Sequence, residues 1–217
     1  MSTEHHLSIR RQARYRVLGT PGPHIREVWF VLHGYGMLAE YFIRHFRAQD
    51  NGTRLIVAPE AFNRFYLKLG GRVGATWMTR EDRERDIADQ RAYLDALYHH
   101  VVQPLGHVYV VALGFSQGAT AACRWAMLGQ ARLDRLVCWA GTLPHDLDLA
   151  PHADALNRLG LLYVLGDRDA YLTAERLAAA EQRLTDAQIN YTLLPYAGTH
   201  RLVPSVLCKV AALIQSG

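Results

Sequence analysis

The sequence is poor in cysteine, and the cysteines that it has are badly placed for cross-linking. Its 217 residues include three, Cys123, Cys138 and Cys208. Their odd number and wide spacing disfavour a disulfide scaffold, and no Cys-x-x-Cys pair offers a metal site. We expect the three thiols to be reduced and mostly buried.

Long apolar runs are also lacking. A helix that spans a bilayer needs roughly 20 apolar residues, and no stretch of the sequence approaches that length. The first residues, MSTEHH, are polar and hold no apolar signal segment. We therefore expect a cytoplasmic protein with no stable membrane insertion.

Charge of one sign does not dominate the chain. The formal net charge is +4, with a pI of about 9.1, and the densest basic stretch covers residues 10–16. Elsewhere basic and acidic residues alternate, as in residues 80–86, which is typical of a solvated helix face. We expect no nucleic-acid partner.

What is present is an ordinary globular composition. The chain is 50% hydrophobic and 20% charged, with a mean hydropathy of −0.07. This excludes disorder as an overall description. The length suits one core, and no repeat or long linker divides the sequence, so we predict a single domain over residues 1–217.

Short apolar runs alternate with patterns of helical period. The predicted strands are residues 28–32, 55–58, 108–113, 136–140, 161–165 and 191–194. The predicted helices are residues 39–47, 79–102, 117–128, 173–184 and 203 onward, with Thr79 and Thr173 as N-caps, and residues 60–78 are interpreted as a long functional loop. Because the strands are apolar on both faces, we predict an α/β fold with a parallel sheet covered by helices on both faces.

A nucleophile motif follows the most hydrophobic strand. Residues 114–118 read Gly-Phe-Ser-Gln-Gly, a match to G-x-S-x-G at the junction between a predicted strand and a predicted helix. In that setting the serine adopts a strained backbone and presents its hydroxyl above the sheet, with glycine needed on either side. Ser116 is therefore the candidate nucleophile.

A serine nucleophile needs a base, and the base needs an orienting acid. Among eleven histidines, His200 lies just after the last predicted strand and before the last helix. Two acids, Asp167 and Asp169, follow strand 161–165, and we favour Asp169 because it lies farther from the strand end. Asp167 instead suits a turn-capping role. The order Ser116, Asp, His200 is that of the α/β-hydrolases.

Acyl transfer also needs donors for the developing oxyanion. The backbone N–H of Gln117, directly after the serine, is one candidate donor. The second is the N–H of Tyr35 in the His33-Gly34-Tyr35-Gly36 loop after strand 28–32. His33 itself is interpreted as holding this loop in place.

The same loop permits a competing interpretation. Residues 34–39 match G-x-G-x-x-G/A after a strand, and Glu60 lies about 20 residues beyond, as in a dinucleotide-binding oxidoreductase. That interpretation leaves Ser116, Asp169 and His200 without a common purpose. A hydrolase-like binding protein without turnover is a third hypothesis.

These residues together resemble the carboxylesterase/phospholipase family of small serine hydrolases, which includes the acyl-protein thioesterases. The matching pieces are Leu32-His33-Gly34-Tyr35-Gly36, Gly114-Phe115-Ser116-Gln117-Gly118-Ala119, Ala140-Gly141-Thr142-Leu143-Pro144, Gly166-Asp167-Arg168-Asp169 and Gly198-Thr199-His200. The resemblance implies an α/β-hydrolase fold without a large lid domain, cleavage of carboxylic esters or thioesters, and no cofactor or metal. It also implies the triad Ser116, Asp169 and His200.

The resemblance does not extend to the substrate. Met37 stands where the family often has Asp, and Leu172-Thr173 stands where it often has Val-Pro. We expect a small-molecule ester with a short to medium acyl chain, with acyl-protein thioesterase or lysophospholipase activity as the alternative. The oligomeric state is left open, a homodimer included. Side chains that follow strand ends are predicted to line the acyl pocket: Trp77, Met78, Leu143 and Leu172, with Phe65, Tyr66 and Tyr171.

Overall fold

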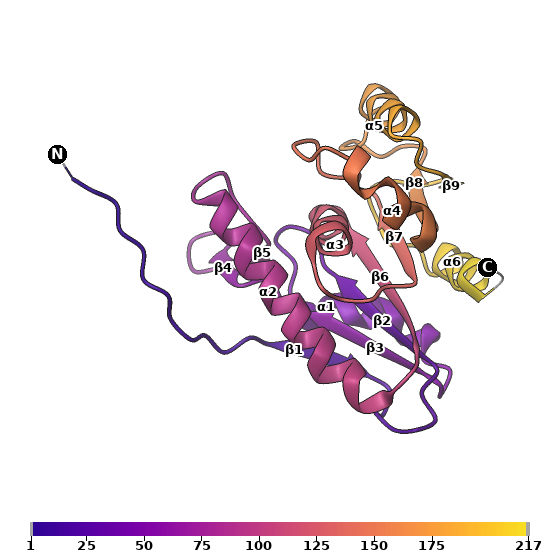
Figure 1. Ribbon diagram of the computed structural model, residues 1–217, viewed down its shortest axis with the longest axis horizontal. Coiled ribbons are helices and arrows are strands. Elements are labelled where there is room, and N and C mark those ends of the chain that lie inside the picture. Colours follow the sequence, from indigo (N-terminus) through magenta and orange to yellow (C-terminus); the bar gives the residue numbers. More distant parts are fainter. Residues whose placement is uncertain (1, 216–217) are drawn as a thin grey trace.

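One seven-stranded sheet forms the centre of the protein (Figure 1). The computed structural model describes residues 2–215. The strand order is β1-β3-β2-β6-β7-β8-β9, and every neighbouring pair is parallel except β1 with β3. The strands are β1 (Tyr15–Leu18), β2 (Glu27–Leu32), β3 (Arg54–Pro59), β6 (Tyr109–Phe115), β7 (Arg135–Trp139), β8 (Leu161–Gly166) and β9 (Tyr191–Tyr196). The predicted α/β fold with a mostly parallel sheet is confirmed.

Helices cover both faces of this sheet (Figure 1). The helices are α1 (Ala39–Phe42), η1 (Ile43–Gln49), α2 (Arg83–Val102), η2 (Gln103–Leu105), α3 (Gln117–Leu128), η3 (Ala150–His152), α4 (Ala153–Leu159), α5 (Ala174–Asp186) and α6 (Pro204–Gln215). Side chains of α2, α3, α4 and α5 pack on one face, and those of α1, η1 and α6 on the other.

The core shows why the central strands are apolar throughout. Along β2, Val28 and Phe30 enter the core under α2 and α3, whereas Trp29 and Val31 enter the core under α1 and α6. Successive strand residues point to opposite faces, so a strand covered on both sides needs apolar residues at every position.

Several predicted boundaries differ from the structure. The helix expected over residues 39–47 is one α-helical turn, α1, that continues as the 3-10 helix η1 to Gln49. The helix expected from Thr79 begins at Arg83 instead, because the Thr79 hydroxyl accepts a hydrogen bond from the Glu81 amide in a preceding turn. Thr173 does cap α5, since its side chain accepts from the Arg176 amide.

The segment expected to be a loop over residues 60–78 contains a second, two-stranded sheet. Its strands are β4 (Asn63–Tyr66) and β5 (Val73–Thr76), which pair antiparallel. The hairpin is tied to the loop after β2, because the Gly36 amide donates to the Ala75 carbonyl and the Ala75 amide to the Met37 carbonyl. The hairpin therefore supports the loop that carries Tyr35.

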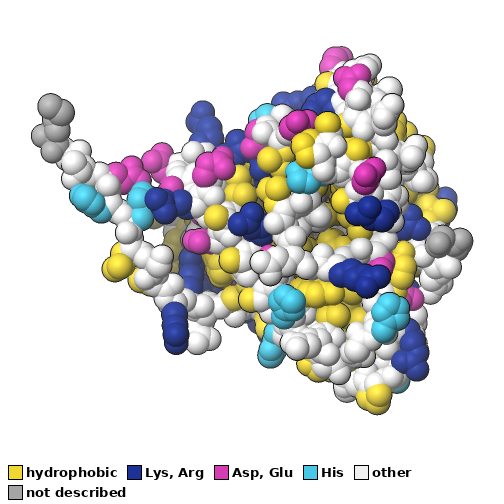
Figure 2. Space-filling model, viewed as in Figure 1, with side chains coloured by type: hydrophobic (Ala, Val, Ile, Leu, Met, Phe, Trp, Pro, Cys, Tyr) yellow, Lys and Arg dark blue, Asp and Glu magenta, His cyan; other side chains and the backbone are white. Residues whose placement is uncertain are grey.

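The basic stretch near the N-terminus is partly used inside the fold. Arg14 pairs with the buried carboxylate of Glu60 at 2.6 Å, and Arg16 with Glu40 at 3.1 Å. Residues 2–14 hold no regular structure, and the first part of this segment reaches away from the sheet (Figure 1). Basic and acidic side chains are interspersed on the face in Figure 2. Within the described residues, no helix has the length and apolarity needed to cross a membrane.

Candidate active site

Ser116 occupies a strained turn between β6 and α3. Its φ is 55° and its ψ −119°, a backbone conformation that L-residues rarely adopt. A Cβ on Gly114 would overlap the backbone of Gly118, and a Cβ on Gly118 would overlap the carbonyl oxygen of Leu32. Glycine at both positions is thus required for β6, the turn and the start of α3 to come so close.

Three side chains from three segments meet at this turn. The His200 Nε2 atom lies 2.9 Å from the Ser116 Oγ, and its Nδ1 lies 2.7 Å from the Asp169 Oδ2. The Asp169 side chain is fully buried and that of His200 is 19% exposed. With Nδ1 protonated, the imidazole donates to the carboxylate and offers Nε2 to the hydroxyl proton. This is the geometry of a nucleophile, its base and an orienting acid.

The structure separates the two acids after β8. Asp169 uses its second oxygen, Oδ1, to accept from the amides of Tyr171 and Leu172 at 2.9 and 3.2 Å, so its carboxylate is held while Oδ2 faces His200. The Asp167 Oδ1 accepts from the Gly198 amide at 2.8 Å. Asp167 therefore ties the loop before His200 to the end of β8, and the turn-capping contacts expected of Asp167 are made by Asp169.

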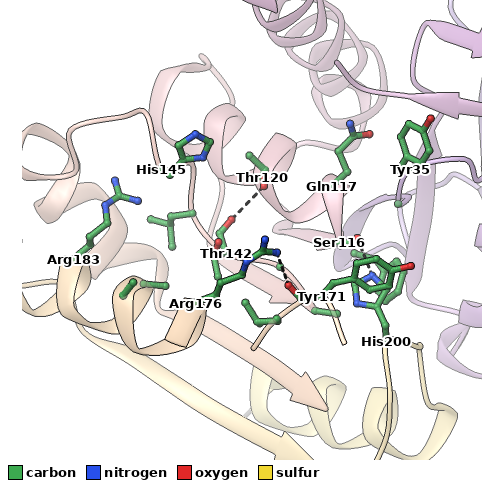
Figure 3. Close-up of a pocket in the computed structure, with 18 of the residues that line it drawn as sticks. Tyr35, Ser116, Gln117, Thr120, Thr142, His145, Tyr171, Arg176, Arg183 and His200 are labelled. Atoms are coloured by element: carbon green, nitrogen blue, oxygen red, sulfur yellow. Dashed lines mark hydrogen bonds between the residues drawn. The ribbon is translucent and has the colours of Figure 1, made fainter. Parts of the chain in front are cut away.

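Two residues of the cavity in front of Ser116 carry backbone amides suited to an oxyanion, one in the loop after β2 and one directly after Ser116. Among residues 2–215, neither the Tyr35 N–H nor the Gln117 N–H donates a hydrogen bond, and both residues line that cavity (Figure 3). Gln117 is also the first residue of α3, where the positive end of the helix dipole favours an anion. This arrangement can stabilise an oxyanion.

His33 holds the loop that carries the Tyr35 amide. Its Nδ1–H donates to the Gly34 carbonyl at 2.8 Å, and its Nε2 accepts from the Ala61 amide at 3.1 Å. Burial lowers the pKa of His33, and this effect outweighs the Gly34 hydrogen bond and the Glu60 charge, which raise it. The imidazole is therefore neutral and acts as a bridge between two backbone segments.

The dinucleotide-binding hypothesis is wrong. Glu60, the supposed ribose ligand, is 2% exposed, and its carboxylate binds Arg14, Arg64 and the Ala39 amide. The segment after the glycines enters a single α-helical turn and not the long helix that binds a pyrophosphate.

The Gln117 side chain is a brace that sequence analysis missed. Its Oε1 accepts from the Trp77 amide at 3.0 Å, and its Nε2 donates to the Thr76 hydroxyl and the Met78 carbonyl at 2.9 and 3.0 Å. These contacts join α3 to the end of β5. The signal was the residue type, since a glutamine beside a nucleophile has four hydrogen-bonding sites to satisfy.

The residues predicted to line the acyl pocket divide into two groups. Leu143 and Leu172 line a cavity of about 820 Å³ that opens at Ser116. Tyr171 lines it as well, whereas the other predicted residues do not, namely Phe65, Tyr66, Trp77 and Met78. Trp77 is 1% exposed, and its indole N–H donates to the His33 carbonyl at 2.8 Å, so it supports the loop from behind. Met78 follows it and offers its carbonyl to Gln117.

The far part of this cavity was not foreseen. Arg176 and Arg183 project into it from α5, and His145 joins them from the segment after β7 (Figure 3). Positions 176, 179, 180 and 183 share one face of a helix, and all four line the cavity. The available signal was that helical spacing directly after the segment that holds Asp169.

The residues that could gather around a metal ion lie away from the cavity. Among the described residues, one cluster could place three ligand atoms within 4.8 Å of one another, formed by Glu4, His6 and Asp82. All three are exposed, and none lines the cavity.

Comparisons with known proteins agree with this architecture. The model of the phospholipase/carboxylesterase family matches residues 17–216. Acyl-protein thioesterase 2 of Zea mays is 19% identical with a TM-score of 0.74, over 94% of this chain and 99% of that one. The esterase PE8 is 21% identical with a TM-score of 0.68, over 95% and 99%.

A phospholipase/carboxylesterase from Dyadobacter fermentans is 15% identical with a TM-score of 0.67, over 96% of this chain and 99% of that one. A comparison with curated proteins gives no match. The solved structures show that the α/β-hydrolase fold extends over nearly the whole chain without a large added domain. On the family model, which covers most of its length, the chain belongs to the phospholipase/carboxylesterase family of hydrolases.

Proposed function

We propose that the protein is a serine esterase that hydrolyses carboxylic esters with a short to medium acyl chain. Ser116 is the nucleophile, His200 the general base and acid, and Asp169 the orienting carboxylate. The observation that carries this proposal is the unbroken chain of hydrogen bonds from the Ser116 Oγ through His200 to Asp169 at 2.9 and 2.7 Å.

The reaction proceeds through an acyl-enzyme. The Ser116 oxygen attacks the ester carbonyl as its proton moves to the His200 Nε2, and the amides of Tyr35 and Gln117 bind the resulting oxyanion. His200 then gives the proton to the departing alcohol, which leaves an acyl-Ser116. Water, deprotonated by His200, attacks this ester and releases the acid and Ser116. Asp169 keeps the imidazole in the required tautomer and stabilises the imidazolium.

The size and lining of the cavity favour acyl chains of limited length. It has a volume of about 820 Å³, and Leu143 and Leu172 supply apolar contacts near Ser116. Charged side chains also line the cavity. The apolar end of a long acyl chain would displace water from a guanidinium group without replacing its hydrogen bonds, which costs free energy. A series of p-nitrophenyl esters should therefore peak below the chain lengths of membrane lipids.

Active-site labelling tests the proposal. A fluorophosphonate should label the wild-type protein and not Ser116→Ala, and p-nitrophenyl butyrate hydrolysis should fall by about 10⁴-fold or more in that variant. Circular dichroism should show an unchanged fold. Full hydrolysis by purified Ser116→Ala protein would disprove the assignment, and so would stoichiometric labelling at another residue.

Thioester or lysophospholipid hydrolysis is the second candidate. The likeness to a structure named an acyl-protein thioesterase favours it, and the same acyl-Ser116 would form. An oxygen ester and a thioester of the same acid distinguish an esterase from a thioesterase. For a thioesterase, the ratio of kcat/KM for the thioester to that for the oxygen ester should exceed the ratio of their spontaneous hydrolysis rates.

A further inference from the structure

The cavity that opens at Ser116 combines apolar side chains with a group of basic ones, which Arg176, Arg183 and His145 supply (Figure 3). Leu143 and Leu172 belong to its apolar lining, and Figure 3 shows Arg183 farthest from Ser116, with Arg176 between Arg183 and Tyr171. Two alanines, Ala179 and Ala180, lie between the arginines on the same helix face. Ser116, both alanines and both arginines thus line one continuous cavity.

The charge in this part of the cavity is of one sign. No Asp or Glu within residues 2–215 lines the cavity, and neither Arg176 nor Arg183 makes an ion pair with a carboxylate in that part of the chain. His145 adds an exposed imidazole beside them. An anion that enters the cavity would therefore meet donors with no internal competitor.

Three acids share an adjoining groove with His145 and Arg183, and none of them lines the cavity. Asp146, next to His145, is held by Arg124 at 2.5 Å and by Arg83 at 3.0 Å. Asp148 and Asp186 border the adjoining groove that Arg183 also reaches, and among the described residues neither forms an ion pair with it. The carboxylates thus lie outside the cavity wall.

The two arginines are held by neutral hydrogen bonds. Arg183 donates to the carbonyls of Pro144 and Leu147 at 2.9 and 2.6 Å, and Arg176 donates to the Tyr171 carbonyl at 2.8 Å. These bonds fix where the guanidinium groups lie and leave their charge uncompensated. A guanidinium with free N–H groups binds carboxylate and phosphate oxygens in a paired, directional manner.

We propose that the cavity binds an acyl chain that ends in a carboxylate, so that the preferred substrates are half-esters of dicarboxylic acids. This rests on the proposed function. The chain lies along Leu143 and Leu172, and its carboxylate meets Arg176 and Arg183. Hydrolysis breaks the ester C–O bond, and water supplies the oxygen and the protons, so the products are the alcohol and the dicarboxylate.

A pair of fluorogenic esters tests this directly. The monoesters of 4-methylumbelliferone with adipic and hexanoic acid share chain length and leaving group and differ in a terminal carboxylate against a methyl group. Because charge-assisted hydrogen bonds are worth about tenfold to a hundredfold in affinity, the wild-type kcat/KM for the adipate should exceed that for the hexanoate by about tenfold or more. Added salt should narrow the difference.

The charge reversal Arg176→Glu should lower the adipate-to-hexanoate ratio by at least about tenfold, since it replaces a donor by a like charge. Arg158→Glu is the matched control: Arg158 is an exposed arginine on α4 that pairs with no carboxylate of residues 2–215, and it borders a different groove. Arg183→Lys, which keeps the charge and loses the paired geometry, should lower the ratio by a smaller factor. An equal ratio in Arg176→Glu, Arg158→Glu and wild type would overturn the proposal, as would a wild-type preference for hexanoate.

Two further arms separate the possible failures. The first arm compares hexanoyl glycerol phosphate with hexanoyl glycerol, which places the anion on the alcohol part of the ester. If this pair shows a preference that depends on Arg176 and the adipate pair does not, the proposal that the acyl chain carries the anion is overturned. Calorimetric binding of the adipate monoester to Ser116→Ala needs no turnover. Binding that Arg176→Glu abolishes supports the anion site even if the wild type hydrolyses neither ester, and in that case the esterase proposal alone has failed.

Discussion

The two ends of the cavity are built by different means. At the reacting end, the backbone fixes two of the groups: a strained turn carries Ser116, and two amides hold the Asp169 carboxylate. At the far end, long side chains reach in from one face of α5, and Arg176 is exposed. The reacting end depends on how β6, β8 and β9 lie in the sheet, whereas the far end depends on which residues one helix carries.

This difference means that chemistry and selectivity respond differently to substitution. A change near Ser116 must be accommodated by close-packed backbone, so it should cost activity or stability. A change on α5 should alter which substrate is preferred and leave the fold intact. A substitution at the reacting end can therefore be paired with a control substitution that should have little effect.

Apart from loss of the nucleophile itself, the largest effect is expected at Asp169. Asp169→Asn removes the acceptor that fixes the His200 tautomer, so kcat should fall on the order of 10³–10⁴-fold. Asp167→Asn, two residues away, keeps an oxygen that can accept from the Gly198 amide and should lower kcat less than about tenfold. Ester hydrolysis by the two purified variants checks this. Equal losses would mean that the acids share the role.

A single added methyl group at Gly118 should cost stability. Its Cβ would overlap the Leu32 carbonyl oxygen, so Gly118→Ala forces β2 and α3 apart. We expect a loss of about 2–3 kcal/mol in the free energy of unfolding, the cost of overpacking less the better helix propensity of alanine. Ala179→Ser, which adds one atom on the cavity face of α5, should cost about 0.5 kcal/mol. Urea titrations measure both losses of unfolding free energy, and the dependence of that free energy on urea concentration should not change.

The parts of the site within a few residues of a strand end could be predicted from the sequence. Ser116 and the Gln117 amide follow from one strand-turn-helix motif, because the chemistry needs that local geometry. For the acid, the sequence favours Asp169 without excluding Asp167, since both lie within three residues of β8 and only the packing of the loop around His200 distinguishes them.

The remaining features depend on contacts between distant segments. The sequence does not predict β1, because this edge strand has only four residues, its two central residues are both exposed, and its partner β3 lies about 40 residues away. The β4–β5 hairpin was missed for the same reason, since each strand has four residues and Gly74 interrupts the second. Trp77 follows a strand, which predicts a position in the pocket, but its indole N–H instead donates a hydrogen bond to the His33 carbonyl.

Loss of the Gln117 side chain should have an intermediate effect. Gln117→Ala leaves the Trp77 amide without its acceptor, which should lower the free energy of unfolding by about 1–2 kcal/mol. Because β5 supports the loop with Tyr35, kcat should fall several-fold with a smaller change in KM. Gln182→Ala on α5 removes one exposed hydrogen bond, to Asp186, and should cost less than about 0.5 kcal/mol. An equal effect of the two variants would show that the Gln117 side chain is not a brace.

The smallest effect is a pH dependence that comes from His33. Burial lowers the pKa of His33, so the unfolded chain takes up the proton first as pH falls below about 6.5. The unfolded state then binds more protons than the folded one, and the contribution of His33 to stability, fully present above about pH 6.5, is lost as pH falls through the lower pKa of the folded state. His33→Asn cannot titrate, so the difference in unfolding free energy between wild type and variant should shrink from about pH 7.5 to about pH 5. Urea titrations at several pH values in that interval measure it, and a constant difference would mean that His33 takes up its proton without cost and is not the rigid bridge behind Tyr35.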